Sequence, residues 1–184
     1  MDMARDLFYA QQAIVALFSV TNKLQMQGDK HLKDLTIRQM LAIPALVHAP
    51  DGKANVNNIA KTMGTSKQNA KQIVNALMKK GYLSVEPSVK DKRALQITIT
   101  AKGKKAFEVC SQRTDEFLAN TFSAFSSRDL EVFSNLLDKL YNSDSTEKES
   151  IAVNAVFNAR NSKEILLHHK SFAKLRSKAQ LKEV

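Results

Sequence analysis

Residues 54–83 read ANVNNIAKTMGTSKQNAKQIVNALMKKGYL, and this stretch decides the fold. Asn57 is placed to cap a short helix that continues through Met63, because an asparagine side chain can accept a hydrogen bond from the first turn. Gly64 follows at the position where glycine commonly ends a helix. The first half of the stretch therefore predicts one short helix and a tight turn.

The second half of the stretch predicts another helix. Thr65 opens it, with Gln68 three residues later as the partner of a capping box, and it runs to Lys80 before Gly81. Two helices joined by a three- or four-residue turn that contains glycine form the helix-turn-helix pattern.

The two faces of this second helix differ in chemistry. Apolar residues at spacings of three and four predict a buried stripe made of Ala70, Ile73, Val74 and Leu77. The other face has no acid between Thr65 and Gly81 and carries Lys67, Gln68, Lys71, Gln72 and Asn75. Cations suit phosphates, and Asn or Gln can donate and accept in one plane at an adenine edge. A merely solvated face usually mixes Glu with Lys, so the pattern favours contact with DNA.

A hairpin follows the helix pair. Residues 82–86 alternate apolar and polar side chains until Pro87, and in VKDKRALQITITAKG, residues 89–103, the alternation resumes at Leu95. A helix-turn-helix followed by two strands predicts a winged helix, with a basic loop as the wing. Lys90, Lys92 and Arg93 project from this loop, where an arginine can enter a narrow minor groove. Asp91 either orients Arg93 or closes the turn.

The positive charge of the chain is concentrated in this module. The 184 residues carry a net charge of +10, and residues 36–105 hold 13 Lys and Arg against three acids, which accounts for the whole imbalance. Such a local field favours a polyanionic partner. A lysine-rich face that only keeps the protein in solution is the alternative.

Helices are predicted on both sides of the module. Residues 3–27 have apolar side chains near helical spacing and are interrupted at Gly28, and Thr36 is placed to cap a helix over residues 36–47. After Gly103 a long helix carries an apolar ridge, and Ser126 with Asp129 predicts a capping box for the helix that follows.

The hairpin and the helix pair together resemble one known family. The run from Asp91 to Gly103 matches D-x-R, three residues, an aliphatic, x, an aliphatic, T, two residues, G, which is the wing signature of the MarR (multiple antibiotic resistance regulator) family. Residues 59–83 resemble its helix-turn-helix, and the likeness covers about residues 5–141.

The resemblance implies a mainly α fold with a small antiparallel β-hairpin wing, in a homodimeric, cytoplasmic, bacterial DNA-binding regulator, by expectation a repressor. It divides the chain into an N-terminal dimerisation helix (1–35), a winged helix-turn-helix (36–103), C-terminal dimerisation helices (104–141) and a helical extension (142–184). The helix at about 65–80 would read the major groove of a pseudo-palindromic operator and the wing at about 87–95 the minor groove. The implied DNA-binding residues are Ser66, Lys67, Gln68, Asn69, Lys71, Gln72, Asn75, Lys90, Asp91, Lys92 and Arg93.

Family members often bind small aromatic acids, so the resemblance admits an effector of this kind and no other cofactor. Some sense oxidants through a cysteine of the first helix, but the single cysteine here, Cys110, falls on an apolar ridge and is predicted to be an inert core residue. No histidine has a carboxylate or cysteine at ligand spacing, so no metal site is predicted.

The extension departs from the family pattern. Residues 151–159 and 163–181 are predicted to be helical, and the alternatives for them are packing on the dimer, contact with flanking DNA, or binding of another protein.

Other classes of protein have less support. No Gly-rich phosphate loop or nucleophile elbow is present, so no enzyme is predicted. No run of about 18 apolar residues predicts a membrane span, and the acid-containing N-terminus lacks a signal-peptide core. The main alternative is a winged helix whose basic face docks an acidic protein.

Overall fold

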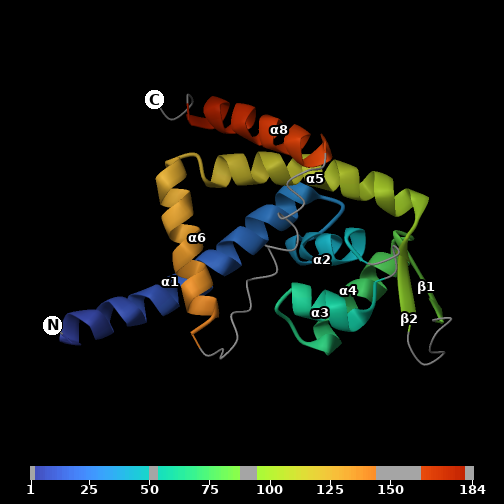
Figure 1. The fold of residues 1–184 in the computed structure, drawn as a ribbon, viewed down its shortest axis with the longest axis horizontal. Helices are drawn as coiled ribbons and strands as arrows, with labels where there is room; N and C mark the ends of the chain where they lie inside the picture. Colours follow the sequence, from blue (N-terminus) through green and yellow to red (C-terminus); the bar gives the residue numbers. More distant parts are fainter. Residues whose placement is uncertain (1–2, 50–53, 88–94, 144–162, 181–184) are drawn as a thin grey trace.

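The computed structural model describes residues 3–49, 54–87, 95–143 and 163–180. These residues form helices and one two-stranded antiparallel sheet, which confirms the predicted mainly α fold with a β-hairpin (Figure 1). The elements are α1 (Met3–Leu32), α2 (Ile37–Val47), α3 (Val56–Thr62), α4 (Lys67–Lys79), β1 (Leu83–Pro87), β2 (Leu95–Ile99), α5 (Ala101–Thr121), α6 (Ser127–Tyr141) and α8 (Lys163–Gln180).

The core lies where α2, α3, α4, α5 and the hairpin meet. The predicted stripe of α4 faces it, since Ala70, Val74 and Leu77 are buried. They pack with buried side chains from the other elements, which include Leu32, Leu35, Ala42, Leu46, Ile59, Leu83, Ile97 and Phe107. One side of α4 is therefore held against the body of the protein along its length.

The cap of α3 lies two residues before the predicted one. Asn55, not Asn57, is the N-cap, and its side-chain Oδ1 accepts a hydrogen bond of 2.9 Å from the backbone N–H of Asn58. The preceding residue, Ala54, exchanges two backbone hydrogen bonds with Ile97 of β2. Because this pairing ends at Ala54, the chain turns into the helix directly afterwards.

The start of α4 differs from the prediction by one residue. Ser66 is the N-cap, and its Oγ accepts a hydrogen bond of 3.2 Å from the N–H of Asn69. Thr65 instead accepts from the side chain of Asn69, so the capping box with Gln68 is not formed. The predicted ends are confirmed, since Gly64 and Gly81 have φ angles of 58° and 74°, a region that glycine enters without strain.

The hairpin pairs Leu83 with Ile99 and Val85 with Ile97, which turns one face of the sheet toward the core. β1 ends at Pro87, as predicted, and Pro87 is paired with Leu95. A proline is compatible with this position because β1 has only one neighbouring strand, so the missing N–H breaks no second ladder.

The first helix does not break at Gly28, contrary to the prediction. α1 continues to Leu32, and Gly28 is buried where α1 crosses α2. A Cβ on Gly28 would lie 2.3 Å from side-chain atoms of Ile37, so the glycine permits a close helix crossing instead of a turn. Long-range packing here overrides the low helix propensity of glycine.

Two further helices, α6 and α8, follow α5. Ser126 and Asp129 form the predicted capping box at the start of α6. α8 lies along α5, and its Gln180 side chain donates a hydrogen bond of 3.0 Å to the carbonyl of Ser123, while Arg176 donates to the carbonyl of Phe125.

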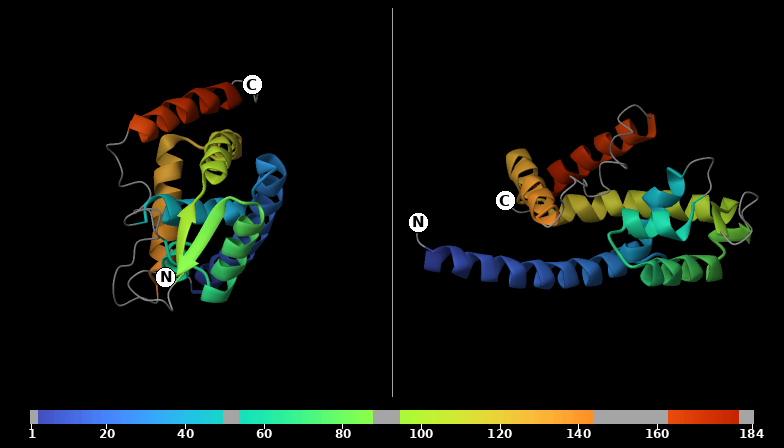
Figure 2. Two further views of the ribbon diagram at one scale, coloured as in Figure 1. Left: turned by 90° about the vertical axis from the view of Figure 1, so that its right-hand side faces the viewer. Right: turned by 60° about the horizontal axis from the view of Figure 1, so that its bottom comes forward.

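α1 projects beyond the rest of the molecule (Figure 2). Within the described ranges, no helix is both long and apolar enough to cross a membrane.

Candidate nucleic-acid interface

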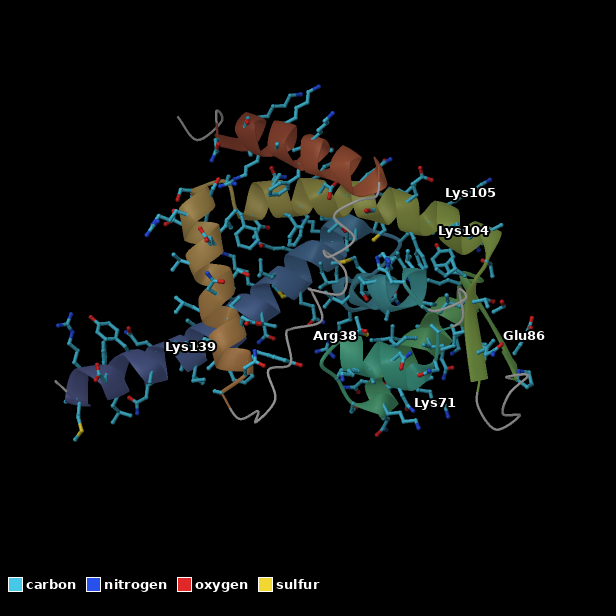
Figure 3. The ribbon with its side chains drawn as sticks, viewed as in Figure 1. Arg38, Lys71, Glu86, Lys104, Lys105 and Lys139 are labelled. Atoms are coloured by element: carbon cyan, nitrogen blue, oxygen red, sulfur yellow. The ribbon has the colours of Figure 1, made fainter. Side chains whose placement is uncertain are left out.

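The outer face of α4 presents a group of polar side chains to solvent. All seven of its predicted site residues are exposed: Ser66, Lys67, Gln68, Asn69, Lys71, Gln72 and Asn75. Lys71 points away from the body of the protein (Figure 3). The face contains two cations and no carboxylate, so it offers donors for phosphates and planar amides for base edges.

Two of these residues, Ser66 and Asn69, also stabilise the first turn of α4. Ser66 caps the N–H of Asn69, and the Nδ2 of Asn69 donates a hydrogen bond of 3.2 Å to Thr65 Oγ1. Their side chains therefore stabilise the first turn of α4, where backbone N–H groups and the positive end of the helix dipole also face outward. Lys67, Gln68, Lys71, Gln72 and Asn75 form the rest of the face.

The base of the hairpin is tied to the end of α4. Thr100 Oγ1 donates a hydrogen bond of 2.8 Å to the carbonyl of Gly81, directly after the helix. Lys102 Nζ donates one of 2.7 Å to the carbonyl of Lys80 and lies 5.4 Å from the ring centre of Tyr82. These contacts give the hairpin a defined orientation relative to the exposed face of α4.

The four predicted wing residues, Lys90, Asp91, Lys92 and Arg93, lie outside the described residues. The described stem ends at Pro87 and begins again at Leu95, so the segment between them joins the far ends of two paired strands.

Several polar residues that fix α4 in place were not identified from the sequence. Lys80, Gln39 and Arg113 make hydrogen bonds that join α4, α2 and α5 to the turn after α1. Each partner lies 41 to 81 residues away in the chain, so no local pattern marks these residues. Exposed Arg38 on α2 is a further cation of the basic segment that the predicted set omits (Figure 3).

A cavity of about 1110 Å³ lies between α2, β2, α5 and α8. Its apolar lining includes Ile43, Leu46 and Phe107, and its polar lining includes Lys104, Glu108, Gln112, Asp115, Lys170 and Lys174. The cavity therefore lies between the winged helix-turn-helix, which contributes α2 and β2 to its lining, and the extension, which contributes α8. No cluster of three or more metal-ligating side chains occurs in the part of the chain that the structure describes.

The fold and the exposed face of α4 define the class of this protein as a winged helix-turn-helix protein. Residues 33–94 match the model of the MarR family. A relative, the transcriptional activatory protein BadR of Rhodopseudomonas palustris, is 25% identical over 115 residues, which cover 61% of this chain and 62% of BadR. The match therefore spans less than two thirds of that relative.

Solved structures show the same fold. A transcriptional regulator that senses organohalides, RdhR-CbdbA1625 with bound 2,4-dichlorophenol, has a TM-score of 0.70 at 14% identity, covering 77% of this chain and 87% of its own. MepR of S. aureus, solved in a complex with DNA, has a TM-score of 0.64 at 23% identity, covering 70% and 95%. The chain therefore resembles the MarR family over residues 33–94, and its fold is the winged helix fold of these solved structures.

Proposed function

We propose that this protein is a homodimer that binds a pseudo-palindromic operator and represses transcription there. One observation carries the proposal, namely the acid-free exposed face of α4, whose cations and amides match phosphates and base edges. The seven residues of this face would lie in the major groove. Lys90, Asp91, Lys92 and Arg93 would form a wing at the minor groove.

The exposed surface of α1 and α6 supports the dimer. Of the residues of α1 only Gly28 and Leu32 are buried, and α6 has no buried residue. The large apolar side chains exposed on these helices include Leu7, Phe8, Ile14, Phe18, Leu136 and Leu140. An apolar surface of this size is unfavourable in water unless another surface covers it. A second copy brings the same helices together, and the extension packs on α5 at the edge of this assembly.

A two-fold dimer places its two recognition helices in successive major grooves, about 34 Å apart. With roughly eight phosphate contacts per dimer, log K would fall with log salt at a slope of about −7. Binding of the purified protein to its own upstream DNA, measured over a range of salt, tests this. The variants are Lys71→Ala and, as a control that removes the same charge, Lys178→Ala at an exposed position of α8, away from α4 (Figure 1).

We expect Lys71→Ala to weaken binding and to reduce the slope by about two per dimer, because one phosphate contact is lost in each subunit. Lys178→Ala should behave as wild type, and Arg93→Ala should weaken binding with the dimer intact. Equal affinity for upstream DNA and unrelated DNA of the same length would contradict the proposal. It would favour the alternative of a basic face that docks an acidic protein.

The related BadR is named as an activatory protein, which makes activation a second candidate. Both modes use the same DNA contacts and differ in where the operator lies relative to the promoter. Transcription from the bound promoter in vitro separates them: repression lowers the transcript as protein is added, and activation raises it.

The cavity supports a small aromatic effector. The related structures carry 2,4-dichlorophenol in one case and, in BpsR of Bordetella bronchiseptica, concern regulation of DNA binding by 6-hydroxynicotinic acid. Apolar side chains such as Phe107 would cover an aromatic ring, and Lys170 and Lys174 would face its acidic group. These two compounds are suitable probes. A rise in melting temperature that is reduced in Lys174→Ala supports the site, and an unchanged rise in that variant contradicts it.

A further inference from the structure

The turn between α1 and α2 is anchored by two buried leucines, while Lys33 and Asp34 between them are exposed. α1 ends at Leu32, Lys33 has a φ angle of 60°, and both Leu32 and Leu35 are only 1% exposed. The last carbonyls of a helix have no partners within it and form the negative end of the helix dipole. The end of α1 therefore offers acceptors that cations from neighbouring elements can satisfy.

Two cations converge on this turn from opposite parts of the chain. Arg113 of α5 donates hydrogen bonds from Nη1 to the carbonyl of Leu32, at 2.9 Å, and to Asp34 Oδ2, at 3.0 Å. Lys80, the C-cap of α4, donates from Nζ to the carbonyl of Asp34, at 2.6 Å. Hydrogen bonds with a charged donor are roughly twice as strong as neutral ones. These bonds therefore attach α5 and the end of α4 to the turn.

A third group completes the arrangement. Lys80 Nζ also donates a hydrogen bond of 3.0 Å to Oε1 of Gln39, a side chain that is 8% exposed. The same Oε1 accepts from the N–H of Thr36 at the start of α2. The end of α4 is thus bound to the end of α1 and the start of α2 through one ammonium group.

We infer that Lys80 is a positioning residue that sets the orientation of α4 relative to α1 and α5. This inference rests on the proposed function, in which α1 belongs to the dimer interface and α4 reads one half-site. Burial of the apolar stripe disfavours removal of α4 from the core. It opposes small rotations of α4 less strongly, because the hydrophobic effect is non-directional. The directed bonds of Lys80 add a constraint on such rotations relative to α1. We call the residues that form this contact the α1–α4 joint (Leu32–Thr36, Gln39, Lys80 and Arg113).

The α1–α4 joint affects how the proposed dimer binds two DNA half-sites at the same time. A dimer with rigidly placed recognition helices binds tightly only when the half-sites have the matching separation. A dimer whose helices can rotate still contacts phosphates but tolerates a wrong separation. Loss of Lys80 should therefore reduce selectivity for half-site spacing more than affinity for DNA.

Lys80→Met tests this inference, because methionine keeps most of the side-chain length and removes the ammonium group. Gln39 Oε1 keeps its bond from the N–H of Thr36, so the variant leaves that buried acceptor satisfied. Lys79→Met is the matched control, since it removes the same charge from the adjacent, exposed position. Affinity is measured for the operator and for operators with one or two base pairs inserted or deleted between the half-sites.

We expect the wild type and Lys79→Met to prefer the natural spacing to the same degree. In Lys80→Met the preference should fall about tenfold, the scale of one hydrogen bond to a charged group. Lys80→Arg, which restores a long cationic donor, should recover part of it. If Lys80→Met unfolds early, Lys80→Gln replaces it and the same fall is expected.

The outcomes separate this inference from the proposed function. If the wild type shows no preference for any DNA sequence, the proposed function is wrong. If the wild type discriminates spacing and Lys80→Met does so equally well, the positioning role is wrong while the function stands.

Discussion

At the scale of single residues, Cys110 illustrates how burial controls chemistry. Its side chain is 2% exposed, and burial raises the pKa of the thiol, outweighing the hydrogen bond with Thr114 and the positive charge of Arg113, which lower it. Since the thiolate is the reactive form, a raised pKa makes the group slow to react. The structure agrees with the prediction of an inert core cysteine.

Cys110 should therefore react slowly with a disulfide reagent such as DTNB near neutral pH. The reaction should accelerate greatly in denaturant, where both the burial and the raised pKa are lost. The measurement is the rate of thionitrobenzoate release with and without urea. A folded protein that reacts as fast as the unfolded one would show that the thiol is accessible.

Asp129 behaves in the opposite way at the start of α6. Hydrogen bonds from the Ser126 hydroxyl and the Ser126 N–H lower the pKa of this carboxyl. A lowered folded pKa means that the capping box stabilises the protein above the usual aspartate pKa of about 3.9. This stabilisation is lost as the pH falls through the lowered value.

Asp129→Ala should accordingly reduce the free energy of unfolding at neutral pH. The difference from wild type should shrink as the pH falls below about 4, because the wild-type carboxyl becomes protonated there. Urea denaturation followed by circular dichroism at several pH values measures it. Asp138→Ala, an exposed acid later in α6, is the control for the loss of charge alone. A difference that stayed constant with pH would mean that the carboxylate does not act as the cap.

At the scale of elements, glycine positions show how helices and strands approach one another. Gly103 lies in the first turn of α5, where its N–H donates to the capping hydroxyl of Thr100. A Cβ at this position would lie 2.1 Å from the carbonyl oxygen of Tyr82. Since that neighbour is backbone, it cannot move away without shifting the start of β1.

Gly103→Ala should thus destabilise the protein by about 1–3 kcal/mol, the usual cost of overpacking. Lys104→Ala, an exposed change in the same turn, should alter the unfolding free energy by less than about 0.5 kcal/mol. Both values come from denaturant titration. Similar stabilities for the two variants would show that the contact between α5 and Tyr82 is looser than the structure indicates.

The elements also show where local patterns suffice. The stripe of α4, the Thr36 cap of α2 and the Ser126–Asp129 box were all predicted, because each depends on residues within one or two turns. The caps of α3 and α4 were misplaced, since Asn57 and Thr65 have neighbours of equal capping ability. Pairing of Ala54 with a distant strand settles the first case.

At the scale of the whole molecule, the projecting α1 is the feature that a single chain leaves unexplained (Figure 2). Phe18 is 70% exposed and Leu7 is 59% exposed, although both are large apolar side chains. In the proposed dimer these side chains become buried.

Phe18→Glu should weaken the dimer, because it would place a charge in an apolar interface. Light scattering coupled to size-exclusion chromatography should show a shift toward monomer at low concentration. Gln12→Glu adds the same charge at an exposed position on a different side of α1 from Phe18 and is a control for charge itself. If Phe18→Glu leaves the mass at that of a dimer, the interface lies elsewhere.

The sequence by itself determined the winged helix, the direction of α4 and the composition of its outer face, because periodicity, glycines and caps act over a few residues. Only the tertiary structure decided that α1 runs through Gly28, that α8 lies along α5 and that Lys80 and Arg113 meet at the end of α1. These features join residues far apart in the chain. Their free energy comes from close packing and directed hydrogen bonds that exist only after the elements have come together.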